Sequence, residues 1–198
     1  MKKILALILA VCCIFALASC QFFTGTETPD DSYAIPDIQA KIDASAPSGA
    51  DITVTFKTSL GDLNGAYDVT YNEDGTANVD YSYEQFNTIE AGVSELKSTV
   101  TGTVTVAADG SVSGTLTTEA LNAVSFDLKL DENKLSNVAI NAGVLSANVK
   151  AADTAAVLGV AIDCDVQLTV VTGTNGITSM TVAYTTNFGA VEIVTLYK

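Results

Sequence analysis

The stretch that decides the fold is residues 162–184, whose sequence is IDCDVQLTVVTGTNGITSMTVAY. Apolar and polar side chains alternate over residues 162–170, and large apolar side chains recur at every second position over residues 180–184. A period of two places every second side chain on the same face of a strand, so each run predicts a half-buried β-strand. Between the runs, residues 173–176 (Gly-Thr-Asn-Gly) are of the kinds that tolerate positive φ in a tight turn. The stretch therefore predicts an antiparallel hairpin.

The same alternation recurs along most of the chain and predicts about eleven strands. They are expected within residues 52–56, 67–71, 77–83, 100–106, 112–116, 124–130, 135–141, 145–149, 162–170, 180–184 and 191–193. Short turns at residues 73–75, 109–111 and 131–134 join them, so consecutive strands should pair antiparallel. The predicted fold class is all-β and mainly antiparallel. A meander of this size does not stay flat, so we expect an up-and-down sheet that curls into a half-barrel or a barrel.

Helical signals occur before the predicted strands and among them. Residues 35–44 carry three isoleucines at steps of three and four, which gives a short N-terminal helix with one apolar face. Residues 153–158 predict a second short helix, with Asp153 in position to cap its first turn. Residues 87–97 lack the alternation and predict a longer loop or a helical turn.

The chain begins with a segment typical of export signals. Two lysines precede an apolar run over residues 4–15, which is too short to span a bilayer comfortably as a helix. The run leads into Leu17-Ala18-Ser19-Cys20, which resembles the lipobox of bacterial lipoproteins. The resemblance implies that the signal is cut before Cys20 and that Cys20 carries the lipid that anchors the chain. A plain secretory signal is the alternative.

This interpretation divides the chain into three regions. Residues 1–19 are the signal peptide, residues 20–34 are the lipidated cysteine and a flexible tether, and residues 35–198 are a single β-meander domain. The tether is polar and contains proline and glycine, which predicts a random coil with a reach of roughly 20 Å. The expected location is the cell envelope, outside the cytoplasm and anchored to a membrane by lipid.

Composition removes several classes of function. The net charge is -14, the nine basic residues are all lysine, and the chain has no histidine, arginine or tryptophan. Catalytic sites built on histidine and histidine-ligated zinc are therefore excluded. A surface this acidic does not favour nucleic acid. We expect no enzymatic activity, no catalytic residue, no metal site and no cofactor.

Four tyrosines are the best candidates for a recognition surface. Tyr67, Tyr71, Tyr81 and Tyr83 lie on two predicted strands whose turn is centred near Asp74, so they should meet across a hairpin. They could line a pocket for an apolar or sugar ligand, since tyrosine combines an apolar ring with a polar tip. The alternative is that they fill a tyrosine-rich edge of the core.

The predicted arrangement resembles the half-barrel of the lipoprotein-carrier and mycobacterial lipid-binding lipoproteins, the LolA, LolB and LppX group. The likeness lies in the anchor, the N-terminal helix, the long meander and the helical interruption. It implies a curved sheet that binds an apolar molecule such as a lipid, although the carriers depend in part on an arginine that this chain lacks. The alternative is a structural or interaction protein of the cell surface, with a filled core and no ligand. Interior volume separates the two, since a ligand pocket needs about 300 to 1,000 Å³.

Overall fold

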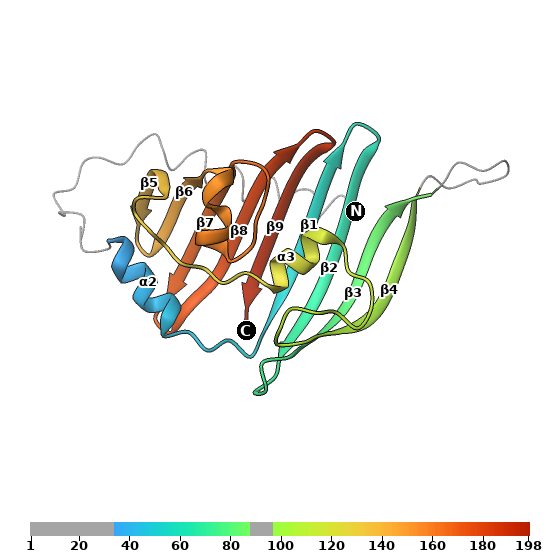
Figure 1. Cartoon of the computed structure of the whole chain (residues 1–198), viewed down its shortest axis with the longest axis horizontal. Coiled ribbons are helices and arrows are strands. Elements are labelled where there is room, and N and C mark those ends of the chain that lie inside the picture. Colours follow the sequence, from blue (N-terminus) through green and yellow to red (C-terminus); the bar gives the residue numbers. More distant parts are fainter. Residues whose placement is uncertain (1–33, 88–96) are drawn as a thin grey trace, which may run out of the picture. The chain divides into compact units, whose positions relative to one another are not determined.

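A computed structural model describes residues 34–87 and 97–198. Within them, nine strands form one antiparallel sheet in the order β4-β3-β2-β1-β9-β8-β7-β6-β5 (Figure 1). The strands are β1 Gly49–Thr58, β2 Gly61–Tyr71, β3 Ala77–Phe86, β4 Lys97–Val106, β5 Leu135–Asn141, β6 Val144–Val149, β7 Val166–Gly173, β8 Gly176–Thr186 and β9 Gly189–Tyr197. The helices are α2 Ile35–Asp43, α3 Thr118–Val124 and α4 Thr154–Leu158, and a 3-10 turn, η1 Ala151–Asp153, precedes α4.

The antiparallel β class is confirmed, and the count of eleven strands is wrong for the described residues. The signal peptide, Cys20 and nearly all of the tether lie outside those residues. So does most of the loop predicted over residues 87–97.

The order of strands departs from a simple meander at one place. Strands β1 to β4 pair consecutively, and so do β5 to β9, but β4 and β5 are the two edges of the sheet. In the middle of the sheet β1 pairs with β9, from Ala50 opposite Tyr197 to Thr58 opposite Gly189, and this pairing joins the two sets of strands. The described sheet is therefore open, and the closed barrel is wrong. The cause is the long connection over residues 107–134, which carries α3 across one face of the sheet (Figure 1).

The strand predicted over residues 112–116 is wrong. After the turn at Gly110, only an isolated bridge joins Val112 to Val106. The Ser113 amide donates to the Thr105 carbonyl at 3.0 Å, and the Ser113 hydroxyl accepts the Thr105 amide at 3.0 Å. A side-chain oxygen thus takes the place that a strand carbonyl would fill, and the ladder ends there.

The strand predicted over residues 124–130 is also wrong, because its first residue ends α3 and the rest pairs with no strand. The segment is extended, and its alternation is correct for burial, since Leu128 is buried and Lys129 is exposed. Its amides bond instead to the end of α4. Asp127 donates to the Leu158 carbonyl at 2.9 Å, and Lys129 donates to the Val157 carbonyl at 2.8 Å.

The predicted N-terminal helix is confirmed as α2, with Ile35 and Ile38 buried. The second helix is also confirmed, as η1 followed by α4, but Asp153 forms no side-chain cap. The Asp165 carboxylate instead accepts the Ala151 amide at 3.0 Å, at the start of η1. The predicted strand over residues 162–170 begins late, because the Ile162 amide donates to the buried Thr154 hydroxyl at 2.8 Å.

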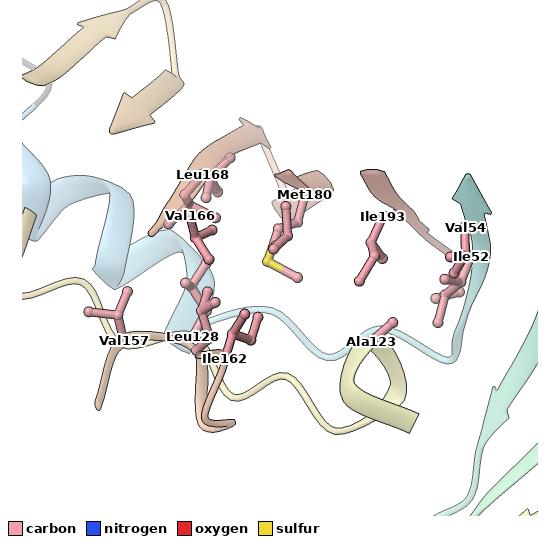
Figure 2. Packing of buried hydrophobic residues seen from close by; sticks show 14 of the residues in the cluster. Ile52, Val54, Ala123, Leu128, Val157, Ile162, Val166, Leu168, Met180 and Ile193 are labelled. Atoms are coloured by element: carbon pink, nitrogen blue, oxygen red, sulfur yellow. The ribbon is translucent and has the colours of Figure 1, made fainter. Parts of the chain in front are cut away.

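The core lies on one face of the sheet. Helix α2 contacts β7 and β8, and α3 contacts β1 and β9. Figure 2 shows side chains of β1, β7, β8 and β9 pointing from the sheet toward Ala123 of α3 and toward Leu128, Val157 and Ile162. We call this side the covered face. The opposite side, the open face, carries many threonines, among them Thr53, Thr101, Thr103, Thr105 and Thr185, all exposed.

One polar atom in the core lacks a partner. Thr195 is 1% exposed on the covered face, opposite Ile52 and Met180 in the register, and its hydroxyl has no hydrogen bond among the described residues. Thr195→Val replaces that hydroxyl with a methyl group, so we expect the free energy of unfolding in urea to rise by about 1 to 2 kcal/mol. Thr53→Val, on the open face, is the control and should change it by less than about 0.5 kcal/mol. A loss of stability in Thr195→Val would contradict the assignment.

Candidate functional site

The structure brings three of the four predicted tyrosines together. Tyr67 lies directly opposite Tyr81 in the pairing of β2 with β3, as the turn near Asp74 predicted. The Tyr81 and Tyr83 rings stack with centroids 5.7 Å apart and an interplanar angle of 28°. Tyr71 lies four residues further along β2, opposite Ala77, and is therefore separate from the other three.

Tyr67 is a core residue. Its side chain is 3% exposed, and its hydroxyl lies 3.2 Å from the Thr117 hydroxyl in a hydrogen bond. Thr117 is the N-cap of α3, where its oxygen also accepts the Ala120 amide at 3.2 Å. Burial is the largest influence on the Tyr67 phenol and raises its pKa, while the bond to Thr117 opposes the rise. Tyr67 therefore fastens the start of α3 to the sheet.

The Tyr81 side chain lies over a position of the neighbouring strand that has no side chain. Its partner across the β3 and β4 pair is Gly102, and a Cβ at that position would lie 2.5 Å from the Tyr81 hydroxyl oxygen. The ring thus occupies the space that a side chain on β4 would otherwise fill. A side chain at position 102 would therefore require the Tyr81 ring to move, and with glycine there the half-buried Tyr81 shields the exposed backbone of β4.

Tyr67 and Tyr83 border a small hollow beneath α3. Its volume is about 60 Å³. The residues that line it are Val54, Phe56, Leu63, Asn64, Gly65, Tyr67, Tyr83, Glu84, Thr117 and Glu119. A lipid or other drug-sized ligand needs about 300 to 1,000 Å³, so the hollow as it stands is several times too small.

Sequence reasoning missed the part of this site that comes from α3. Thr117 and Glu119 lie between two stretches predicted as strands, so their helix was not expected. The available signal was local: Thr117 precedes an acidic residue in the first turn and then Ala-Leu, a pattern typical of a helix N-terminus. Phe56 was predicted on a strand. It lines the same hollow as Tyr83, but the two residues are far apart in the sequence, so no local pattern indicates that they share a site.

Glu119 places a negative charge between two tyrosines. Its charge raises the pKa of Tyr67 on β2 and also that of Tyr184 on β8. For Tyr184 the largest cause is burial, followed by Glu119 and by Cys164, and together they raise the pKa to about 12. Burial and the Glu119 charge therefore both favour the neutral form of the Tyr67 and Tyr184 phenols.

The raised pKa of Tyr184 predicts a loss of stability in alkali. The folded chain holds this proton more tightly than the unfolded chain, whose tyrosine ionises near pH 10. Its contribution is thus complete below pH 10 and is lost as the pH rises through about 12. We expect the Tm to fall over this range, and to fall less in Tyr184→Phe. Melts of both proteins at matched pH values test this, and equal falls would contradict it.

Larger hollows lie elsewhere in the described part, and two of them exceed 300 Å³. One, about 470 Å³, is on the open face and is lined in part by Lys57, Asp165, Gln167 and Glu192. The other, about 620 Å³, lies between α2 and residues 130–133. Each is lined by charged and amide side chains together with apolar ones, and neither includes any of the four tyrosines.

The carboxylates of the acidic turns at Asp74 and Asp109 accept hydrogen bonds from residues of the same turn. The Asp74 carboxylate accepts the Thr76 hydroxyl at 2.7 Å and the Thr76 amide at 3.0 Å, and Asp109 accepts the Ser111 amide at 2.9 Å. Hydrogen bonds from the hydroxyl and the amide of Thr76 lower the pKa of the Asp74 carboxyl, and those from the hydroxyl and the amide of Ser111 lower that of the Asp109 carboxyl. Among residues 34–87 and 97–198, no group of three or more histidine, cysteine, aspartate or glutamate side chains is placed to hold a metal ion.

No described helix is long and apolar enough to cross a membrane. In comparisons with known proteins, no family model and no curated protein matched the chain.

Proposed function

We propose that the protein is a lipid-anchored, non-enzymatic protein of the cell envelope whose domain acts as an interaction scaffold with a filled interior. The observation that carries this proposal is the packing at the predicted tyrosine site. Tyr67 is 3% exposed and is bonded to the cap of α3, and the hollow beside it holds about 60 Å³. A carrier of lipids needs room that this site lacks.

The proposal includes a curled sheet anchored through Cys20. An open antiparallel sheet with helices on one face is consistent with a half-barrel that bends around those helices. The lipobox at residues 17–20 supports the anchor, and the acidic domain would then stand outside the cytoplasm on its tether. The open face, rich in threonine, would be available to a protein or cell-wall partner.

Binding of an apolar ligand is the second candidate. It is favoured by the chemistry of the hollow, whose walls include the rings of Phe56, Tyr67 and Tyr83. Helix α3 forms one side, and it is only seven residues long. A displacement of α3 would enlarge the hollow along the covered face and would break the bond between Tyr67 and Thr117.

Native mass spectrometry of the gently purified protein separates the two candidates. A filled interior predicts the mass of the chain with its anchor and no further adduct. A retained adduct of lipid mass, lost on Tyr83→Ala, would overturn the filled interior and support ligand binding.

The anchor is tested by Cys20→Ser in the full chain. Loss of the thiol removes the site of lipidation, so we expect the protein to move from the membrane fraction to the soluble fraction. Cys164→Ser is the matched control and should stay with the membrane, because Cys164 lies within the domain. Membrane retention of Cys20→Ser would contradict the anchor.

A further inference from the structure

Two large apolar side chains stand out from the end of the sheet. Leu60 is 77% exposed and Phe188 is 81% exposed, more than any other large hydrophobic residue in the described part. Leu60 lies in the turn between β1 and β2, and Phe188 lies in the turn between β8 and β9. Neither side chain contributes to the core, so packing gives no reason for an apolar residue at either tip.

The two turns have the same construction. Their sequences are Thr58-Ser59-Leu60-Gly61 and Thr186-Asn187-Phe188-Gly189. In the first, the Thr58 hydroxyl donates to the Gly61 carbonyl at 2.8 Å and accepts the Leu60 amide at 3.1 Å. In the second, Thr186 makes the same two bonds, to the Gly189 carbonyl and from the Phe188 amide, both at 3.1 Å. Each turn ends in a glycine with positive φ, 124° for Gly61 and 156° for Gly189.

These turns also lie side by side. Strands β1 and β9 are neighbours, and Thr58 is paired with Gly189 at this end of the sheet. Figure 1 shows the two hairpin loops next to each other. The centres of the two hairpins are two strand spacings apart, or about 10 Å. Leu60 and Phe188 therefore form a pair of apolar tips held by two rigid turns.

The chemistry and size of the tips indicate what they contact. Neither turn contains a carboxylate, although the chain has 23 acidic residues. Together the two side chains expose on the order of 300 Å². A stable protein interface buries about 1,200 to 2,000 Å², which two tips cannot supply. A bilayer needs no complementary surface, and apolar side chains can be buried at the boundary between its headgroups and acyl chains.

We propose that Leu60 and Phe188 insert into the surface of the bilayer that holds the lipid anchor. The inference rests on the proposed anchor at Cys20. Two side chains give only weak and reversible membrane binding by themselves, as a single acyl chain does. The anchor would supply the necessary proximity, because a flexible tether of about fourteen residues would have an r.m.s. end-to-end distance of roughly 20 Å. Insertion of the tips would then fix the orientation of the tethered domain.

The lack of tryptophan in the chain provides a clean test. Phe188→Trp makes one reporter at the tip, and Leu196→Trp makes one on the open face, where Leu196 is 51% exposed. Each full-length lipidated protein is reconstituted into phosphatidylcholine vesicles with plain or brominated acyl chains. We expect bromine to quench the fluorescence of Phe188→Trp strongly and that of Leu196→Trp little or not at all. Adding Leu60→Asp to Phe188→Trp should reduce the quenching, because the charged tip resists insertion.

Each contrary result has a distinct meaning. If the proteins do not float with the vesicles, the anchor fails. If they float but bromine leaves position 188 unquenched, the anchor stands and insertion of the tips is overturned. Equal quenching at positions 188 and 196 also overturns it. If the emission of Phe188→Trp shifts to the blue with rising protein concentration and independently of lipid, the tips contact other copies of the chain, and the proposal is overturned.

Discussion

Replacing Tyr67 with alanine is expected to lower the free energy of unfolding by about 3 to 5 kcal/mol. The ring is 3% exposed on the covered face, between the sheet and the start of α3. Truncation would leave a cavity there, because neighbouring strands are fixed by their ladders and cannot close around it. It would also leave the Thr117 hydroxyl without its bond to the tyrosine. Urea denaturation of the variant and the parent measures the difference.

Two further variants decide what the loss means. Tyr67→Phe keeps the ring and removes only the hydroxyl, so it should cost about 1 kcal/mol. Tyr83→Ala should cost less than Tyr67→Ala, because Tyr83 is only half-buried and already borders the hollow. A small loss in Tyr67→Ala would show that the ring faces open space, and it would favour a ligand pocket over a filled core.

Leu128→Asp is expected to destabilise the fold by about 3 to 5 kcal/mol, because it places an unpaired charge in the core. Leu128 is 7% exposed, and its carbonyl accepts the Gln39 side-chain amide at 3.3 Å. The Leu130 amide in turn donates to the Gln39 side-chain oxygen at 2.7 Å. A carboxylate at position 128 would therefore disturb the contact of α2 with the extended segment as well as the packing against the sheet.

Lys129→Asp is the matched control for this variant. It introduces the same side chain one residue away, at an exposed position whose ion pair with Asp127 has side chains about two-thirds exposed. Such pairs contribute little, so a change of at most about 1 kcal/mol is expected. Similar denaturation midpoints for Leu128→Asp and Lys129→Asp would contradict the assignment of faces in this segment.

Local alternation predicted which side chains of the sheet are buried, and the short turns predicted the pairing of consecutive strands, but the pairing of residues 124–130 and of β1 with β9 was not predicted. The segment that contains Leu128 shows why. Its alternation correctly separates Leu128 from Lys129, but a pattern of period two is the same whether the backbone bonds to a strand or to the end of a helix. Likewise, nothing in the β1 sequence identifies β9 as its neighbour. The two strands are about 130 residues apart in the sequence (residues 49–58 and 189–197), and no short turn joins them.

For the candidate site, the sequence predicted which tyrosines meet across the hairpin but not what each of them contacts elsewhere. A tight turn fixes register, so the position of Asp74 sufficed to place Tyr67 opposite Tyr81. The role of Tyr67 was not predictable, because it depends on Thr117, fifty residues further along the chain. That contact exists only because the connection after β4 crosses the covered face, which local sequence does not encode.

The pairing of β1 with β9 also determines when this domain can fold. A chain that emerges from the ribosome or a translocon with its N-terminus first can assemble β1 to β4 early, but the inner edge of β1 then has no partner. The edge stays unsatisfied until residues 189–197 have emerged, because those residues form β9. Such long-range closure is slow and leaves a strand edge open to wrong partners in the meantime. Completion of the sheet must therefore wait until β9 has emerged, so the half built from β1 to β4 cannot be finished ahead of the half built from β5 to β9.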